Sequence, residues 1–263
     1  MTLEGKLNFQ LKKLNQNNWK NLNNIIGHRG VKDLAPENTL DSILNAFDLG
    51  LNWVEIDVKV SKDYIPFLLH DDTFNRTTNG KGLANHKNYL DIKKLDAGIF
   101  FYNKPTKIYP PTLKEVLELV KNKKKSLNIE LKPNYGFEKI NVEKILQVME
   151  DFSDVEVFYS SFDLDSCISV KKKLPNCSCS FLVDNFEKYK IQEVIDICLK
   201  FNFFLCGTNI KNISKDVIDI FSKNKIFISV YSEKNINITE AINLWNIGIK
   251  TIFSDDPTEL LKI

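Results

Sequence analysis

Short apolar runs alternate with segments of helical periodicity along most of this chain, and this alternation constrains the fold more than any other feature of the sequence. Strands that alternate with helices are typical of parallel sheets. Eight such pairs within about 250 residues predict a closed (β/α)8 barrel, the TIM-barrel fold of the α/β class. The expected strands are residues 24–28, 53–60, 126–131, 155–160, 178–183, 203–207, 226–231 and 251–253. The expected helices are residues 37–49, 112–122, 137–152, 164–173, 188–201, 215–224, 239–246 and 257–261.

Three segments depart from this alternation. Residues 1–24 place leucines at helical spacing and predict an N-terminal helical segment. Residues 65–69 form a further apolar run after the second strand, and residues 71–111 hold turn residues, lysines and scattered aromatics. We interpret 71–111 as a small inserted subdomain. Because 263 residues of 43% apolar content can build one large core, we expect a single domain over residues 1–263.

An open, doubly wound sheet is the alternative architecture for such a chain. Sheets of that kind usually have a glycine-rich phosphate-binding turn after their first strand. The first expected strand here ends in Gly27-His28-Arg29-Gly30, which is neither a dinucleotide-binding motif nor a P-loop. The sequence therefore favours the barrel.

The composition excludes several classes of function. A net charge of +2, from 36 basic and 34 acidic residues, gives no broad positive field that could hold a nucleic acid. No apolar run approaches the ~20 residues that cross a bilayer, and no export signal is recognisable, so we expect a cytoplasmic protein. Its five cysteines, an odd number, are typical of reduced thiols. The leucine stripe of residues 1–24 fits either a membrane surface or a helix that closes the bottom of a domain, and we favour the second.

Carboxylates gather at two expected strand ends. Glu55 and Asp57 lie two positions apart, so they share one face of their strand, and Glu130 lies on the next strand. Three converging carboxylates repel one another unless a cation neutralises them. A divalent metal with oxygen ligands, Mg²⁺ or Ca²⁺, fits this set. A salt-bridged pair on an open strand is the alternative, but the apolar neighbours of Glu55 and Asp57 argue against it.

Two of the three histidines also leave apolar strand-like runs. His28 follows the first strand, and His70 follows residues 65–69. Beside a metal cluster, this placement favours acid-base catalysis over a structural role. Arg29 and Lys132 add fixed positive charge, and the guanidinium fork suits phosphate oxygens. The third histidine, His86, lies in the insertion without such neighbours.

Taken together, these motifs resemble the glycerophosphodiester phosphodiesterase family, and the resemblance extends from about residue 24 to the end of the chain. Its motifs are Gly27-His28-Arg29-Gly30, Pro36-Glu37-Asn38-Thr39, Glu55-Ile56-Asp57-Val58, His70-Asp71, Glu130-Leu131-Lys132-Pro133, Tyr159-Ser160-Ser161-Phe162-Asp163 and Ile252-Phe253-Ser254-Asp255-Asp256-Pro257. In the insertion, Arg76-Thr77-Thr78-Asn79-Gly80-Lys81-Gly82 is similar to the subdomain that marks this family.

The resemblance implies roles for seven residues. The metal ligands would be Glu55, Asp57 and Glu130; the acid-base pair His28 and His70; the phosphate-binding cations Arg29 and Lys132. Glu37 matches an acidic residue that orients the first loop. Where the family commonly has Trp-Thr-Val-Asn, this chain has Ile228-Ser229-Val230-Tyr231, which makes Tyr231 a candidate for the alcohol side of the pocket.

The implied activity is metal-dependent hydrolysis of glycerophosphodiesters, such as glycerophosphocholine or glycerophosphoethanolamine, to sn-glycerol 3-phosphate and an alcohol. A lysophospholipase D or sphingomyelinase D activity is the nearest alternative. It requires a route for an acyl chain, for which Phe100, Phe101 and Tyr102 of the insertion are candidates. A barrel that binds phosphodiesters without cleaving them is the alternative from another class.

Overall fold

The computed structural model describes residues 22–263 of the chain, and the predicted N-terminal helical segment lies outside them. Within this range the strands form one closed parallel barrel, as the sequence predicts, because β1 pairs with both β9 and β2. A short strand, β3 (Pro66–Leu68), pairs with β2 in antiparallel fashion. The barrel strands are β1 (Ile25–Gly27), β2 (Trp53–Val60), β4 (Ser126–Leu131), β5 (Glu156–Ser161), β6 (Cys179–Val183), β7 (Leu205–Asn209), β8 (Phe227–Tyr231) and β9 (Thr251–Ser254).

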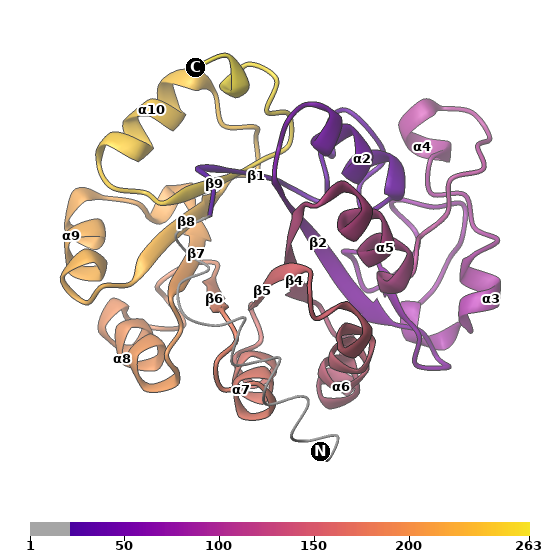
Figure 1. Cartoon of the computed structure of the whole chain (residues 1–263), viewed down its shortest axis with the longest axis horizontal. Helices are drawn as coiled ribbons and strands as arrows, with labels where there is room; N and C mark the ends of the chain where they lie inside the picture. Colours follow the sequence, from indigo (N-terminus) through magenta and orange to yellow (C-terminus); the bar gives the residue numbers. More distant parts are fainter. Residues whose placement is uncertain (1–21) are drawn as a thin grey trace.

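Seven α-helices surround the barrel strands in the part of the chain that is described (Figure 1). They are α2 (Leu40–Asp48), α5 (Leu113–Lys123), α6 (Glu138–Met149), α7 (Leu164–Lys173), α8 (Ile191–Phe201), α9 (Lys215–Lys223) and α10 (Ile238–Asn246). Residues 71–111 follow β3 and lie outside this ring, with the short helices η2 (Ala84–His86), α3 (Tyr89–Ile92) and α4 (Ile99–Tyr102). The remaining short 3-10 helices are η3 (Glu150–Phe152), η4 (Ile210–Asn212) and η5 (Leu260–Lys262).

Several predicted helices start or end up to three residues away in the structure, as at α8, and the first and the last are considered in turn. The first begins at Leu40 and not at residue 37, because Thr39 caps it by accepting a hydrogen bond from the backbone N–H of Ser42. Residues 36–38 therefore stay in the loop after β1, where Glu37 can reach the barrel mouth. The last predicted helix is only the 3-10 turn η5.

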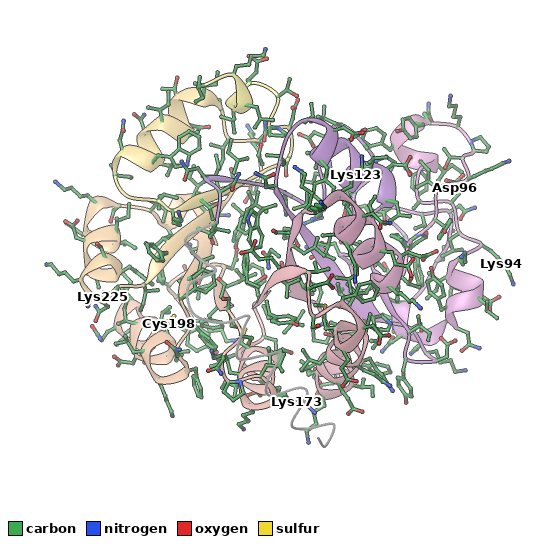
Figure 2. The ribbon with its side chains drawn as sticks, in the orientation of Figure 1. Lys94, Asp96, Lys123, Lys173, Cys198 and Lys225 are labelled. Carbon is green, nitrogen blue, oxygen red and sulfur yellow. The ribbon has the colours of Figure 1, made fainter. Side chains whose placement is uncertain are left out.

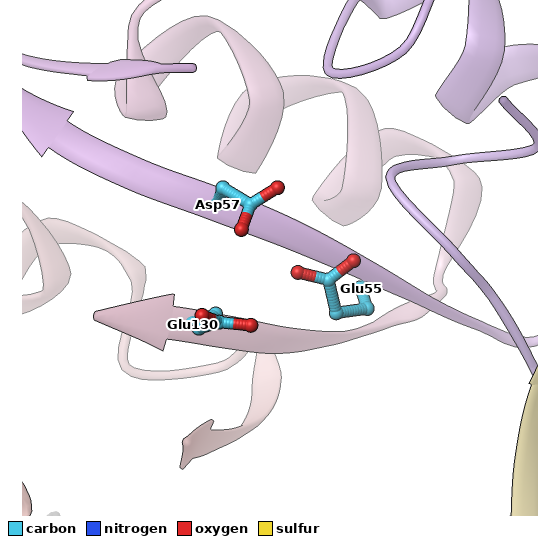
Figure 3. Close-up of side chains that lie close together, drawn as sticks. All are labelled: Glu55, Asp57 and Glu130. Atoms are coloured by element: carbon cyan, nitrogen blue, oxygen red, sulfur yellow. The ribbon is translucent and has the colours of Figure 1, made fainter. Parts of the chain in front are cut away.

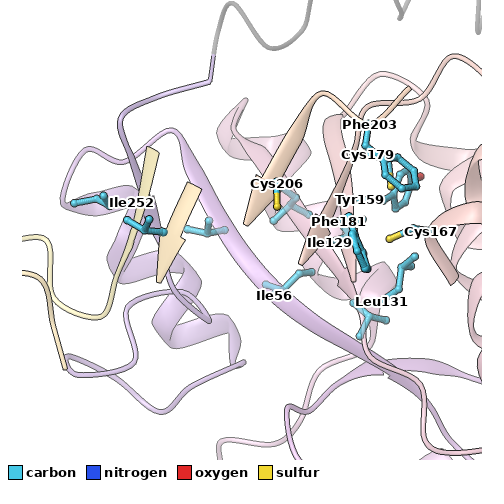
Figure 4. Close-up of a cluster of buried hydrophobic side chains, with 14 of the residues drawn as sticks. Ile56, Ile129, Leu131, Tyr159, Cys167, Cys179, Phe181, Phe203, Cys206 and Ile252 are labelled. Carbon is cyan, nitrogen blue, oxygen red and sulfur yellow. The ribbon is translucent and has the colours of Figure 1, made fainter. Parts of the chain in front are cut away.

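The period-two alternation of the strands separates two apolar layers. Outward residues such as Ile56, Ile129 and Phe181 pack against the helices in the main core, which also holds buried free cysteines (Figure 4). Inside the barrel, Trp53 and Phe158 belong to a second, smaller apolar cluster. Burial of both layers supplies the main stabilisation of the barrel.

Polar side chains fill the barrel above the inner apolar cluster. Asn128, Ser160, Ser180 and Ser229 are fully buried, and the amide of Asn128 donates to the hydroxyl of Ser160 at 2.7 Å. Charged side chains such as Lys94, in contrast, lie on the outside of the molecule (Figure 2). No helix within residues 22–263 combines the length and apolar character of a membrane span.

A close contact between Gly27 and Gly30 fixes the turn that leaves β1. A Cβ atom on Gly27 would lie 2.2 Å from the backbone oxygen of Gly30. We expect Gly27→Ala to lower the free energy of unfolding by about 1–3 kcal/mol, because the backbone must shift. Urea denaturation measures this loss, and Gly136→Ala is the control. Gly136 has a φ of +79° and no atom within 4 Å of an added Cβ, so Gly136→Ala measures backbone strain without a clash and should lose less stability than Gly27→Ala. Equal losses in both variants would contradict the argument.

Candidate active site

The three predicted carboxylates meet at the carboxyl end of the barrel strands (Figure 3). Glu55 and Asp57 lie on β2, and the parallel register pairs Asp57 with Glu130 of β4. Each offers an oxygen within 4.8 Å of the others, and all three are buried. Period-two geometry accounts for this convergence, because residues two apart on a strand point into the same barrel interior.

Two cations offset part of this buried negative charge. The ammonium of Lys132 lies 2.6 Å from Glu130 Oε1 and 3.4 Å from Asp57 Oδ1. The Nε of Arg29 lies 3.5 Å from Asp57 Oδ2. Although burial opposes the effect, Lys132 and Arg29 lower the pKa of Asp57, which is therefore ionised.

Glu55 has no comparable compensation. Burial, followed by the charges of Asp57 and Glu130, raises the pKa of Glu55 well above its ordinary value. Its Oε2 accepts the backbone N–H of Arg29 at 2.9 Å, whereas its buried Oε1 has no hydrogen-bond partner. A hard divalent cation would satisfy this oxygen and remove the repulsion, so the donor set fits Mg²⁺ or Ca²⁺.

Two histidines face the same cavity, and each is held by an aspartate. The Nδ1 of His28 lies 2.6 Å from Asp255 Oδ1, and the Nδ1 of His70 lies 2.8 Å from Asp71 Oδ1. A carboxylate at Nδ1 favours the tautomer with the proton on that nitrogen, which leaves Nε2 free to exchange a proton with a ligand. Burial lowers the pKa of His70, so its imidazole is neutral at pH 7.

A cavity of about 360 Å³ collects most of the predicted residues. Asp57 does not line it, because its carboxylate is buried against Asn38, Arg29 and Lys132. The predicted residues that line it are His28, Arg29, Glu37, Glu55, His70, Glu130, Lys132 and Tyr231. A second groove of about 400 Å³ shares His70, Glu130 and Lys132 with this cavity, so the histidine and the acidic centre lie between two grooves.

The remaining predicted residues have defined partners. Glu37 Oε1 accepts a hydrogen bond from Arg29 Nη1 at 2.9 Å, which aims the guanidinium across the cavity. Tyr231 donates its hydroxyl hydrogen to Asp184 Oδ1 at 2.8 Å, and its ring meets Phe162 edge to face at 5.9 Å. Tyr231 and Phe162 thus form one wall of the cavity.

Four residues at the site were assigned no role from the sequence: Asn38, Asp71, Arg76 and Asp255. The Asn38 amide donates to Asp57 Oδ2 at 2.8 Å, from a backbone with φ of +55°. A carboxylate directly after a strand, as at Asp255, is the signal that could have identified the histidine partners. The pairing itself joins residues 227 positions apart, which no local pattern reveals.

The chain is similar to known proteins over most of its length. The sequence model of the glycerophosphoryl diester phosphodiesterase family matches residues 28–259. A glycerophosphodiester phosphodiesterase of Caldanaerobacter subterraneus subsp. tengcongensis is 31% identical over 242 residues, which covers 91% of this chain and 96% of the relative. One from Bacillus altitudinis is 32% identical over 254 residues, which covers 91% of this chain and 97% of that protein.

A solved structure shows the same fold. The Oleispira antarctica phosphodiesterase in complex with the product sn-glycerol-3-phosphate superposes with a TM-score of 0.86 at 29% identity, over 93% of this chain and 97% of that one. Because the family model matches most of the chain, the chain belongs to the glycerophosphoryl diester phosphodiesterase family.

Proposed function

We propose that this chain hydrolyses glycerophosphodiesters, such as glycerophosphocholine or glycerophosphoethanolamine, to sn-glycerol 3-phosphate and an alcohol. One observation carries the proposal: two aspartate-held histidines face a cavity that is also lined by Glu55 and Glu130 of the buried carboxylate cluster and by the cations Arg29 and Lys132. The names of the relatives, and the product bound to the Oleispira antarctica enzyme, support it.

The carboxylates of Glu55, Asp57 and Glu130 would hold a divalent metal ion, Mg²⁺ or Ca²⁺. When bound, such an ion stabilises negative charge on phosphoryl oxygens. Arg29 and Lys132 would bind the phosphate beside it, since both line the cavity. Glu37 orients Arg29 through the hydrogen bond described above.

The two histidines would move protons in opposite directions. One removes the proton from the nucleophile and the other protonates the leaving alkoxide. If the nucleophile is water, sn-glycerol 3-phosphate forms directly; if it is the neighbouring glycerol hydroxyl, a cyclic phosphate forms first and water then opens it. Both reactions need a free Nε2 on the cavity side, which the contacts of His28 with Asp255 and of His70 with Asp71 provide. Tyr231 would contact the alcohol from the opposite wall.

Acylated substrates are less well supported by the structure. Phe100, Phe101 and Tyr102 are 58%, 41% and 42% exposed, as an apolar rim requires. None of the three, however, lines the cavity or the second groove described above. We therefore favour water-soluble diesters over lysophospholipids or sphingomyelin, and hydrolysis over binding alone.

Product formation from a panel of substrates tests the proposal: sn-glycerol 3-phosphate from the two soluble diesters and lysophosphatidic acid from the lysophospholipid. The panel compares glycerophosphocholine, glycerophosphoethanolamine and lysophosphatidylcholine, each with Mg²⁺ and with Ca²⁺. We expect release from the two soluble diesters and kcat/KM at least tenfold lower for formation of the lysophosphatidic acid product from the third. Faster turnover of lysophosphatidylcholine would favour the lysophospholipase D activity, and substrate binding without any product would favour a non-catalytic barrel.

A further inference from the structure

Arg76 of the insertion connects the two sides of the cavity through its guanidinium. Its Nη1 and Nη2 donate to the two oxygens of Glu37 at 2.7 and 2.8 Å. Its Nε and Nη2 donate to the two oxygens of Asp71 at 2.8 and 2.9 Å. One planar side chain therefore binds two carboxylates in bidentate fashion, a geometry that arginine can form and lysine cannot.

Each of these carboxylates holds a residue of the proposed reaction. Asp71 Oδ1 contacts His70 Nδ1 at 2.8 Å, and Glu37 Oε1 accepts from Arg29 Nη1 at 2.9 Å. The contacts thus form a continuous path from His70 through Asp71, Arg76 and Glu37 to Arg29. This path joins the proposed acid-base group to the proposed phosphate-binding group.

We propose that Arg76 is a positioning residue, which aligns His70 with Arg29 by binding Asp71 and Glu37 at the same time. This inference rests on the proposed function. Without the guanidinium, the two carboxylates would repel each other and their side chains would be free to rotate. Arg76 lowers the pKa of Asp71, and it also lowers that of Glu37 against the effect of burial, so both stay ionised as acceptors.

Among residues 22–263, the contacts of His28 show no such connection to the phosphate-binding side, which makes the arrangement at His70 distinctive. Asp255 holds His28 and is bound by Lys32 Nζ at 2.6 Å. Lys32 also forms an ion pair with its neighbour Asp33, on the protein surface. The residues that hold His28 are therefore not connected through Lys32 to the phosphate-binding side.

Thermal unfolding separates this role from folding. The Arg76 side chain is 48% exposed, but that of Glu37 is only 12% exposed, so loss of the guanidinium also lowers stability. Lys94 is a matched control in the same insertion, because it is paired with Asp91 at 2.8 Å, is 74% exposed and has no contact with the cavity. We expect Lys94→Ala to unfold at nearly the wild-type temperature and Arg76→Ala at a lower one, with both variants folded at the temperature of the assay.

Steady-state kinetics of Arg76→Ala on glycerophosphocholine test the proposal. We expect kcat/KM to fall about 10- to 100-fold, as for other residues that orient a functional group without touching the substrate. Misalignment of His70 should lower kcat, and misalignment of Arg29 should raise KM. Lys94→Ala should match the wild type. Added guanidinium ion should restore part of the lost activity in Arg76→Ala and none in Arg29→Ala/Arg76→Ala. Unchanged kcat and KM in Arg76→Ala would overturn the proposal.

A double-mutant cycle shows whether Arg76 acts through its two partners. If it does, Arg76→Ala combined with Asp71→Asn, or with Glu37→Gln, will lose much less activity than the product of the single losses. Independent, multiplicative losses would overturn the positioning role. Should Arg76→Ala fold poorly, Arg76→Lys takes its place and is still expected to lose activity, because lysine lacks the fork. If the wild-type protein also forms no product, the proposed function is refuted. If the wild type forms product, the same assay tests the positioning role through the variants alone.

Discussion

Alanine at His28, or at His70, is expected to lower kcat by about 10²- to 10⁴-fold, the range that a general acid or base contributes. Both imidazoles turn Nδ1 toward an aspartate and line the cavity, which leaves the Nε2 of each for proton transfer. Single variants of the two should lose activity to a similar extent. The double variant should lose little more, since the two proton transfers serve one reaction.

His86→Ala is the control that the chain offers for this experiment. His86 is the third histidine, lies in η2 of the insertion and does not line the cavity. Its variant should keep wild-type kcat, with metal supplied in every assay. Near wild-type turnover of His28→Ala or His70→Ala would remove that histidine from the reaction.

Glutamine at Glu55 is expected to have opposite effects on stability with and without metal. Burial and the charges of Asp57 and Glu130 raise the pKa of Glu55, so at pH 7 its ionised form opposes folding of the metal-free protein. A neutral amide removes this cost, and metal-free Glu55→Gln should unfold at a temperature at least as high as the wild type.

Metal should reverse that order. At a concentration 100 times its Kd, an ion stabilises the wild type by about 2.7 kcal/mol, and Glu55→Gln should gain far less. Activity of the variant at limiting metal should fall about 10³-fold, since metal ions supply several kcal/mol of charge stabilisation. Thermal unfolding with and without Mg²⁺ or Ca²⁺ measures the first effect.

Glu118→Gln on α5 is the control for the same chemical change, because Glu118 is exposed on the outer helix layer. It should respond to metal as the wild type does. An equal metal-induced rise in unfolding temperature for Glu55→Gln and Glu118→Gln would contradict the assignment of Glu55 as a ligand.

Alternation in the sequence was sufficient to predict the barrel and the acidic centre. The apolar residues of β2 at even positions pack outward, so Glu55 and Asp57 had to point inward. The positions of His28 and His70 directly after apolar strands likewise predicted that both lie at the same cavity. These features depend on neighbours within a few positions, which one sequence displays.

Contacts between distant loops could not be predicted in this way. Asp255 reaches His28 only because β9 closes the barrel beside β1, and Arg76 reaches Glu37 across 39 positions. The first helix begins at Leu40 because Thr39 caps it, whereas the sequence pattern predicted a start at residue 37. A cytoplasmic location and a single domain over 1–263 stay predictions from the sequence.

Restoration of product release by metal is the most direct test of the account. Protein stripped by a chelator is assayed for sn-glycerol 3-phosphate released from glycerophosphocholine and glycerophosphoethanolamine, before and after addition of Mg²⁺ or Ca²⁺. The arrangement of Glu55, Asp57 and Glu130 below two histidines predicts no release from the stripped protein and full release once metal returns. Undiminished release under complete chelation would contradict the metal centre, and absence of product under every condition would contradict the proposed reaction.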